Sequence, residues 1–283
     1  MTESAPGGAA AAQPDDRSCA SDRVPKIEAR GVRKRFASKR GAVLALESID
    51  FVAYPGEFVT IVGPSGCGKS TLLYIVGGFV DATAGEVRVD GRVVTAPDPS
   101  RGIVFQEFAL FPWKTVRGNI AYGPARQGIP RGQRRELVRK YIDMVKLTGF
   151  EKHYPKELSG GMRQRVALAR TLIVDPDVLL MDEPFGSIDA QTRVVLQAEL
   201  LQIWEQTHKT VVFVTHSVEE ALFLSDRIYV LSNRPTTVRD VLRVDLPRPR
   251  DPESILSSPE YVRLHERIWD LLREDQPVDA AND

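Results

Sequence analysis

The chain has 283 residues, of which 42% are hydrophobic, enough for one large domain or one domain with an insertion. Lysine and arginine total 38, as do aspartate and glutamate, so the formal net charge of zero gives no support to nucleic-acid binding, which we do not expect. No apolar run approaches the roughly 18 residues that cross a bilayer, so another chain would have to hold this one at a membrane.

The N-terminal segment, residues 1–23, is rich in alanine, glycine, serine and aspartate, and it has no basic stretch followed by an apolar core. We therefore expect a disordered tail rather than a signal peptide or an anchor. Of the two cysteines, Cys19 lies in this tail and Cys67 in a glycine-rich turn. A structural disulfide is not expected, and a reducing compartment fits.

Residues 27–71 have a pattern that predicts strands followed by a phosphate-binding turn. Residues 27–51 alternate apolar and polar side chains, which predicts antiparallel strands. The apolar run 58–62 predicts a buried strand, and the helix that begins near Lys69 carries apolar residues on one face. Between them, residues 63–71 fit the phosphate-loop pattern G-x-x-x-x-G-K-[ST] at every fixed position.

This loop predicts that the protein binds a nucleoside triphosphate, ATP with Mg²⁺. Its glycines allow consecutive N–H groups to point at phosphate oxygens, and the helix N-terminus adds partial positive charge. Lys69 can reach the β- and γ-phosphates, and the Ser70 hydroxyl can ligate Mg²⁺. A glycine-rich turn that binds nothing is the alternative, disfavoured because a strand and a helix flank the loop. The predicted nucleotide contacts are Gly63, Pro64, Ser65, Gly66, Cys67, Gly68, Lys69, Ser70 and Thr71.

The remaining chain alternates strand and helix signals, with a long helical stretch between two strands. Strand-like runs lie at 85–91, 102–105, 178–181, 210–214 and 228–231. Residues 115–174 have helical periodicity, and 191–206 predict a long helix. The layout is an α/β core interrupted by a helical insert.

The C-terminal part, from residue 239 onward, predicts a connector and one more helix. The proline-rich run 247–252 predicts a stiff connector, and residues 259–273 form an amphipathic pattern. We expect this helix to pack on its own domain; a regulatory or partner-docking role is the alternative.

Two carboxylates follow the apolar strand 178–181. Ligands of α/β folds lie at the carboxyl ends of the strands, which is where Asp182 and Glu183 stand. Asp182 is suited to hold Mg²⁺, directly or through water. Glu183 can orient or deprotonate the water that attacks the γ-phosphate, a contribution typically of about 10² to 10⁴ in rate.

Two further polar residues follow strands that end at the same edge. His216 comes after the apolar strand 211–215, and we expect it to contact the γ-phosphate or the attacking water. Gln106 follows the strand 102–105 and could contribute its amide to Mg²⁺ or to the water. A structural histidine and a solvent-facing glutamine are the alternatives.

A second glycine-rich element, Ser159-Gly160-Gly161, opens a helix after Leu158. Ser159 is a good N-cap, and the two glycines leave N–H groups uncovered, which makes a second phosphate-binding surface. One chain does not need two such loops for one nucleotide. Two copies arranged head-to-tail would need them, because each copy could close over the ATP of the other.

At this point the sequence resembles the nucleotide-binding subunits of ATP-binding cassette transporters, over nearly all of residues 27–231. The motifs stand in the family's order: Walker A at 63–70, the Q-loop at Gln106, the signature at 158–162, Walker B ending at Asp182 and Glu183, the D-loop at 187–189 and the switch histidine at His216. By position, Phe36 looks like the aromatic residue that stacks on adenine, with an ordinary strand residue as the alternative. Three departures, at Met162, at Ser187-Ile188 and at Ser217, remove no phosphate, metal or water ligand.

The resemblance implies a P-loop NTPase (RecA-like) α/β core with an antiparallel β-subdomain and an inserted α-helical subdomain. The ATP-binding domain would span 24–240, with the helical subdomain at about 107–175, and 241–283 would be a C-terminal extension. The activity implied is that of an ATPase coupled to transport. The implied partners are an integral membrane permease, a second copy of the chain and, indirectly, a periplasmic or lipid-anchored substrate-binding protein.

Within the family, residues 106–116 look like the Q-loop region of the nitrate, sulfonate and taurine importers, and residues 246–250 resemble the same branch. Physically, this aromatic stretch could form a socket for a permease helix. Alternatively, Phe108, Phe111 and Trp113 fill the core of the insert, and both readings can hold. The protein would then lie on the cytoplasmic face of a bacterial cell membrane. A soluble cassette ATPase acting on ribosomes or DNA, and a subunit of an exporter, are the alternatives.

Overall fold

The structure, a computed structural model, describes residues 23–38 and 41–273. The tail expected at 1–23 therefore lies, apart from Arg23, outside the described residues. The strands are β1 Ile27–Ser38, β2 Gly41–Ala53, β3 Phe58–Val62, β4 Ala84–Val89, β5 Arg92–Val93, β6 Arg101–Val104, β7 Val178–Asp182, β8 Thr210–Thr215, β9 Arg227–Leu231 and β10 Thr236–Arg243. The helices are α1 Lys69–Gly77, α2 Val116–Ile120, α3 Tyr122–Arg126, α4 Arg131–Met144, α5 Gly160–Leu172, α6 Ala190–Thr207, α7 Val218–Leu224, α8 Pro252–Ile255 and α9 Pro259–Arg273, with a short 3₁₀ helix at Pro155–Glu157.

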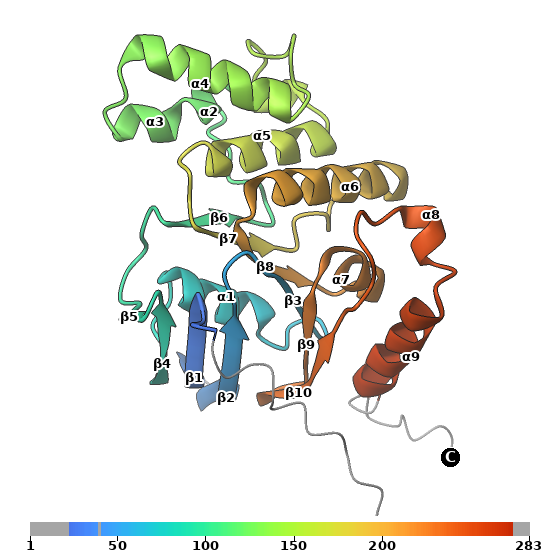
Figure 1. Cartoon of the computed structure of the whole chain (residues 1–283). Helices are drawn as coiled ribbons and strands as arrows, with labels where there is room; N and C mark the ends of the chain where they lie inside the picture. The colour runs from blue at the N-terminus through green and yellow to red at the C-terminus, as the bar shows by residue number, and fades with distance from the viewer. Residues whose placement is uncertain (1–22, 39–40, 274–283) are drawn as a thin grey trace, which may run out of the picture.

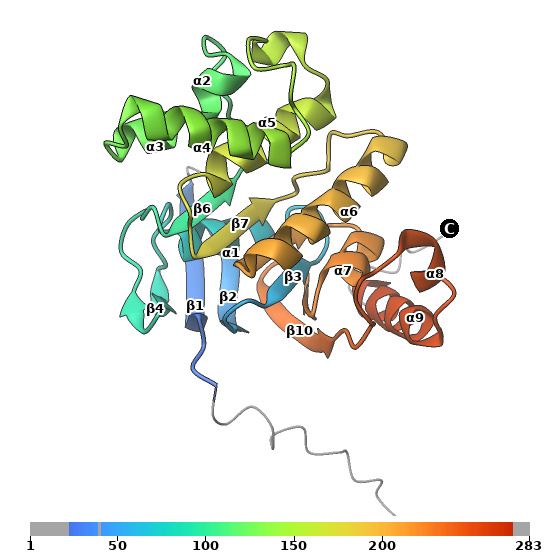
Figure 2. The ribbon, with the colours of Figure 1, turned by 45° about the horizontal axis from the view of Figure 1, so that its top comes forward.

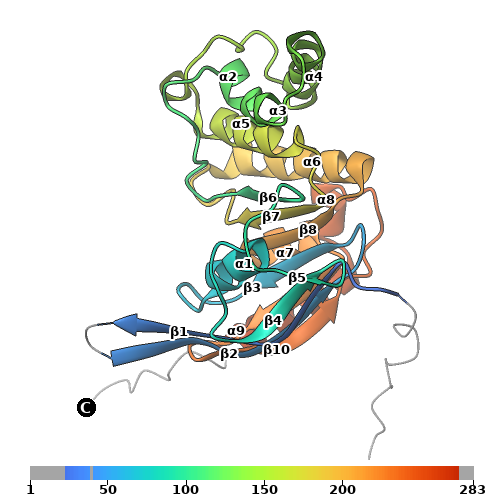
Figure 3. The same cartoon turned by 90° about the vertical axis from the view of Figure 1, so that its left-hand side faces the viewer.

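The described strands form one sheet in the order β5-β4-β1-β2-β10-β9-β3-β8-β7-β6. The half that contains β3 and its neighbours β8, β7 and β6 is parallel, and the half built from β1, β2, β4 and β5 is antiparallel. Figure 3 shows the long β1–β2 ribbon extending away from the parallel half. The prediction of antiparallel strands at 27–51 is confirmed.

Two hydrophobic cores lie on the two faces of the parallel strands, because alternate side chains of one strand point to opposite faces. In β3, Phe58 and Val62 belong to the core under α5, α6 and α7, whereas Val59 and Ile61 belong to the core that α1 shares with the antiparallel strands. All five residues of β3 are buried. A strand covered on both faces reads as a continuous apolar run, which explains why this strand was visible in the sequence.

The helical insert lies between β6 and β7 and forms the upper part of the molecule in Figure 1, above the edge of the sheet. Its helices α2, α3, α4 and α5 all fall within residues 107–175, the range expected for a helical subdomain. The rotated view in Figure 2 places α4 over α5, and α6 between the insert and the sheet.

Two strands were not predicted, the short β5 and the longer β10. β10 pairs antiparallel with β9 and in parallel with β2, so it joins the two halves of the sheet. The boundary expected at residue 240 falls inside it. Its sequence, TTVRDVLR, has only Thr236 buried, so it lacks the apolar run that marked the other strands.

The C-terminal helix α9 packs against α7, β9 and β10, which confirms the expectation that it covers its own domain. The connector before it is held in place by Arg248, which pairs with Asp226 at 2.7 Å, and by Arg250. The buried side chain of Arg250 donates hydrogen bonds to the carbonyls of Leu222, Phe223 and Ser225 at the end of α7, at 3.2, 2.9 and 2.8 Å. Burial lowers the pKa of Arg250 to about 10.

Candidate functional site

The carboxyl ends of three adjacent parallel strands meet at one edge of the sheet. Val62 of β3 lies opposite Thr215 of β8, and Asp182 of β7 lies opposite Val214 of β8. The glycine-rich loop after β3, the two carboxylates at the end of β7 and His216 after β8 are therefore brought together, as the strand pattern predicted.

The glycine-rich loop has a conformation that only glycine adopts easily. Gly66 has φ 74° and Gly68, the N-cap of α1, has φ 118°. A Cβ on Gly68 would also lie 3.0 Å from a methyl group of Leu46, because β2 packs directly against the loop at this residue. The first turn of α1 carries no acidic side chain, which leaves the positive end of the helix dipole open to an anion.

Lys69 is folded back onto its own loop. Its Nζ donates to the carbonyls of Gly63 and Pro64, at 2.9 and 3.0 Å, and lies 3.7 Å from Oε1 of Glu183. The residue is only 4% exposed, so its ammonium is bound by protein oxygens rather than by water. The phosphate oxygens of a nucleotide would compete with these oxygens for the ammonium.

Cys67 fills the space inside the loop as a small side chain. It is buried, and a Cβ on Gly63 would lie 3.1 Å from its Sγ. Burial raises the pKa of the Cys67 thiol, which disfavours the reactive thiolate. The Thr236 hydroxyl donates a hydrogen bond to the Cys67 carbonyl, so β10 supports the loop.

Asp182 accepts hydrogen bonds from two hydroxyl groups of α1. Oγ of Ser70 donates to Oδ1 and the Tyr74 hydroxyl donates to Oδ2, both at 2.7 Å. Burial together with this hydrogen bond raises the pKa of Tyr74 above its usual range. Tyr74 was not predicted as a site residue, although it follows Ser70 by four positions and so lies on the same face of the helix. An oxygen-rich pair of Ser70 and Asp182 fits the ligands that Mg²⁺ prefers.

Glu183 and His216 form a pair beside Asp182. Oε2 of Glu183 lies 3.1 Å from Nδ1 of His216, and the Glu183 N–H donates to the carbonyl of Val214 at 2.9 Å. Glu183 has φ 41°, an uncommon value for a residue with a side chain. A carboxylate that is hydrogen-bonded to an imidazole can orient a water molecule and accept a proton from it.

Gln106 and Phe36 lie at the margins of this group. Gln106 is exposed after β6, and its Nε2 lies 3.9 Å from the position of a Cβ on Gly186; no hydrogen bond joins it to Asp182 or Glu183 in the described chain. Phe36 on β1 is 42% exposed, with Nζ of Lys34 at 5.0 Å from its ring centre. The Lys34 side chain therefore lies over a ring that is otherwise partly exposed.

The second glycine-rich element belongs to the helical insert. The Ser159 hydroxyl accepts from the N–H of Met162 at 3.3 Å, which confirms Ser159 as the N-cap of α5. Gly161 has a second reason to be glycine, because a Cβ there would lie 2.8 Å from a methyl group of Thr192 on α6. Gly160 is partly exposed. No hydrogen bond in the described chain links Ser159, Gly160 or Gly161 to the phosphate loop.

Glu220, a buried carboxylate next to the site, was not predicted from the sequence. It is 5% exposed, and burial raises its pKa. The pattern Ser217-x-x-Glu220 signals a capping box, in which the glutamate would bind back to Ser217 N–H. In the structure the Ser217 N–H donates to Thr215 Oγ1 instead, and Glu220 accepts from the Thr215 hydroxyl at 2.6 Å.

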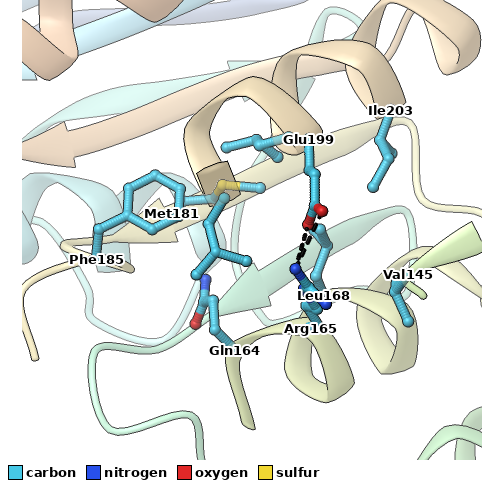
Figure 4. Close-up of a pocket in the computed structure, with 10 residues that line it drawn as sticks. Val145, Gln164, Arg165, Leu168, Met181, Phe185, Glu199 and Ile203 are labelled. Atoms are coloured by element: carbon cyan, nitrogen blue, oxygen red, sulfur yellow. Dashed lines mark hydrogen bonds and ion pairs between the residues drawn. The ribbon is translucent and has the colours of Figure 1, made fainter. Parts of the chain in front are cut away.

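A small cavity of about 20 Å³ lies elsewhere, between α5, α6 and β7 (Figure 4). Glu199 on α6 forms ion pairs beside it with Arg165 on α5 and with Lys146 after α4, at 3.0 and 3.1 Å. This volume is enough for about one water molecule. Oε1 of Gln164 and Nε of Arg165 are buried there without hydrogen-bond partners in the described chain. The cavity lies between the helical insert and the core.

Comparison with known proteins gives consistent matches. The family model described as "ABC transporter" matches residues 46–186. An uncharacterised ABC transporter ATP-binding protein of Methanocaldococcus jannaschii is 47% identical over 92% of this chain and 97% of its own length. The aliphatic sulfonates import ATP-binding protein SsuB of Bacillus cereus is 49% identical, over 79% of this chain and 88% of its own.

The nitrate import ATP-binding protein NrtD of Synechococcus elongatus is 43% identical, over 85% of this chain and 89% of its own. Among solved structures, a dimeric post-hydrolysis state of an ATP-binding cassette bound to ADP and Pi has a TM-score of 0.70 at 31% identity. That match covers 78% of this chain and 100% of the solved chain. These matches agree with the fold expected from the sequence, a P-loop NTPase core.

Proposed function

The chain belongs to the ABC transporter family, and from that premise we propose that it energises a membrane importer of nitrate, a sulfonate, taurine or a related small anion. Its activity is ATP hydrolysis coupled to transport. Sulfonate and nitrate are the solutes in the names of two relatives that cover most of the chain. Taurine rests on the resemblance of residues 106–116 and 246–250 to that branch.

The observation that carries this proposal is the convergence of the phosphate loop with Asp182, Glu183 and His216. Lys69 lies 3.7 Å from Glu183, and Glu183 lies 3.1 Å from His216. A cation for the phosphates, a carboxylate base and an imidazole thus lie in one small region, as phosphoryl transfer to water requires.

In the proposed reaction, ATP takes the place of the loop's own carbonyls at the Lys69 ammonium. The N–H groups of the loop and the N-terminus of α1 hold the phosphates, and Phe36 stacks on the adenine. Glu183 accepts the proton of the attacking water, and His216 fixes the direction of the Glu183 carboxylate and contacts the γ-phosphate. Gln106, which is exposed at the edge, would reach the water or the metal once nucleotide is bound.

We propose Mg²⁺ as the accompanying ion, held by Ser70, Asp182 and Gln106. The pairing of Ser70 with Asp182 at 2.7 Å supplies two oxygen ligands, and magnesium sites in proteins commonly use one or two carboxylates together with substrate phosphates. When bound, the ion neutralises charge that develops on the phosphates. No group of three or more His, Cys, Asp or Glu side chains that could hold a metal ion occurs in residues 23–38 and 41–273.

The signature residues Ser159, Gly160 and Gly161 would act on the ATP of a second copy. Within one chain they belong to the insert and make no hydrogen bond to the phosphate loop of the described residues. Two solved structures that resemble this chain are described as dimeric, one of them with bound ADP and Pi, which supports a head-to-tail homodimer enclosing two ATP.

A membrane permease would dock at the aromatic stretch after Gln106. Phe108 is buried and forms a floor, whereas Trp113 is 71% exposed beside Phe111, at 5.7 Å between ring centres. Arg170 holds this stretch by donating to the carbonyls of Phe108 and Ala109, at 3.0 and 2.6 Å. An exposed aromatic side chain on a fixed backbone is suited to bind an apolar partner.

The other partners follow from this role. A periplasmic or lipid-anchored binding protein would deliver the solute to the permease, and the subunit would lie on the cytoplasmic face of a bacterial cell membrane. None of the described helices is long and apolar enough to span a membrane. The ATP-binding domain would cover 24–243 rather than 24–240, because β10 completes its sheet, and the residues after it would form the extension.

The test is growth of a deletion strain on single sulfur and nitrogen sources, including taurine, alkanesulfonates and nitrate. We expect a defect on one of them that the wild-type gene restores and a Lys69→Ala gene does not. Normal growth on every source would contradict the proposed solute class.

A further inference from the structure

Glu220 stands between the two loops that carry Glu183 and His216. It lies in α7, and each of its carboxylate oxygens contacts a different part of the site. Oε2 accepts the Thr215 hydroxyl at 2.6 Å, and Oε1 accepts from Nε2 of Gln197 at 3.2 Å and lies 3.9 Å from Nε of Arg193. A carboxylate buried to this degree is costly unless it is paired, so these contacts fix its position closely.

The first arm runs from Glu220 to His216. Thr215 is the residue before His216, and its hydroxyl both donates to Glu220 and accepts from the N–H of Ser217 at 3.0 Å. The Ser217 hydroxyl in turn accepts from the N–H of Glu220 at 3.1 Å. The backbone on both sides of His216 is therefore tied to Glu220.

The second arm runs from Glu220 to the turn that begins at Glu183. Nη2 of Arg193 donates to the Ile188 carbonyl at 2.9 Å. The N–H of Ile188 donates to Phe185 and the N–H of Gly186 donates to Glu183, so the turn is one hydrogen-bonded unit. Nε of Arg193 is buried without a hydrogen-bond partner in the described chain, and Glu220 is the carboxylate that faces it.

We propose that Glu220 is the positioning residue of the Glu183–His216 pair, fixing the His216 loop through Thr215 and the Glu183 turn through Arg193. It touches neither nucleotide nor water. Its effect is on the 3.1 Å contact between Glu183 and His216, which requires both loops to be held at once. This inference rests on the proposed function, because that function gives Glu183 and His216 their role in hydrolysis.

The test compares the steady-state ATPase kinetics of Glu220→Gln, Arg193→Met and the double variant with those of wild type. We expect each single variant to lower kcat by about tenfold or more, because small displacements of reacting groups are costly, while KM for ATP changes by less than about twofold. The double variant should be no slower than the slower single variant by more than about twofold, since both act through one linkage.

Glu219→Gln is the matched control, because Glu219 is the adjacent carboxylate but is exposed and faces His265 on α9. Glu219 also accepts a hydrogen bond from the Ser217 hydroxyl at 2.8 Å, which a glutamine amide oxygen can still accept. Its kcat should stay within about twofold of wild type. Arg193 is partly exposed, so Arg193→Met decides the question if Glu220→Gln does not fold.

Single variants that fold and keep wild-type kcat, or that raise KM at unchanged kcat, would overturn the positioning role and leave the proposed function standing. A wild-type protein that does not hydrolyse ATP with Mg²⁺ would overturn the proposed function itself.

Discussion

Oγ of Ser70 donates a 2.7 Å hydrogen bond to Oδ1 of Asp182, which joins two residues 112 positions apart in the chain. Ser70 opens α1, and Asp182 ends β7, two strands away from the strand that leads into α1. The contact brings the phosphate loop and the carboxylate edge into one unit. It is also the pair of oxygen ligands that the proposed magnesium site uses.

From this pair we predict that Ser70→Ala raises the Mg²⁺ concentration needed for half-maximal ATPase activity and lowers kcat/KM by about 10²-fold, because metal stabilisation of phosphate charge is worth several kcal/mol. Titration of MgCl₂ at fixed ATP measures the effect, and excess EDTA should abolish activity in wild type. An unchanged Mg²⁺ requirement would show that Ser70 only links α1 to Asp182 and holds no metal ion.

The exposed ring of Trp113 supports a prediction that separates docking from hydrolysis. Trp113→Ala should leave the ATPase activity of the isolated subunit within about twofold, because the side chain is 71% exposed and makes no contact with the site. Co-purification with the permease from membranes should fall strongly, since exposed aromatic residues often dominate interfaces. Trp269→Ala on α9, also exposed, should not reduce it; equal losses for both variants would contradict this docking surface.

The buried Arg250 predicts a stability effect without a catalytic one. Arg250→Met removes the donor of three hydrogen bonds to α7 carbonyls and should lower the free energy of unfolding by roughly 3 kcal/mol. Arg243→Met is the control, because that side chain is 73% exposed, and a change within about 0.5 kcal/mol is expected. Urea denaturation measures both, and equal effects would show that the connector is not held by Arg250.

Burial of Glu220 makes the stability of the fold depend on pH. Its pKa in the folded protein is raised above the ordinary value of 4.5, so the folded state binds this proton more tightly than the unfolded state does. The stabilisation is fully present below pH 4.5 and is lost as the pH rises through the raised pKa. In Glu220→Gln this loss should disappear, so the stability of wild type relative to the variant should fall as the pH rises. A difference that is constant with pH, followed by chemical denaturation, would contradict the assignment.

Local patterns made much of the site predictable from sequence. The phosphate loop has fixed spacing, and the strands before Asp182 and His216 are continuous apolar runs because both faces of the parallel sheet are covered. The carboxyl ends of such strands meet at one edge, so the neighbourhood of Lys69, Glu183 and His216 followed without knowledge of the sheet order.

Contacts between distant segments were not predictable in the same way. β10 has a single buried residue, so no apolar pattern marks it, and its place was decided by pairing with β9 and β2. Arg250 looks like a solvent-exposed residue of a proline-rich connector until the end of α7 is placed beside it. Glu220 carried a capping signal, but its real partner is Thr215, since that hydroxyl lies within reach only once α7 folds back on β8.

The central claim, that Glu183 is the base of an ATPase that works as a closed pair, is tested most directly by Glu183→Gln. The variant keeps the shape of the side chain but cannot accept the proton, so hydrolysis should fall by about 10²-fold or more while ATP still binds. Gel filtration with ATP and Mg²⁺ should then show a stable dimer, and the variant that also carries Lys69→Ala should stay monomeric. Hydrolysis by Glu183→Gln at the wild-type rate, with no ATP-dependent dimer, would contradict the claim.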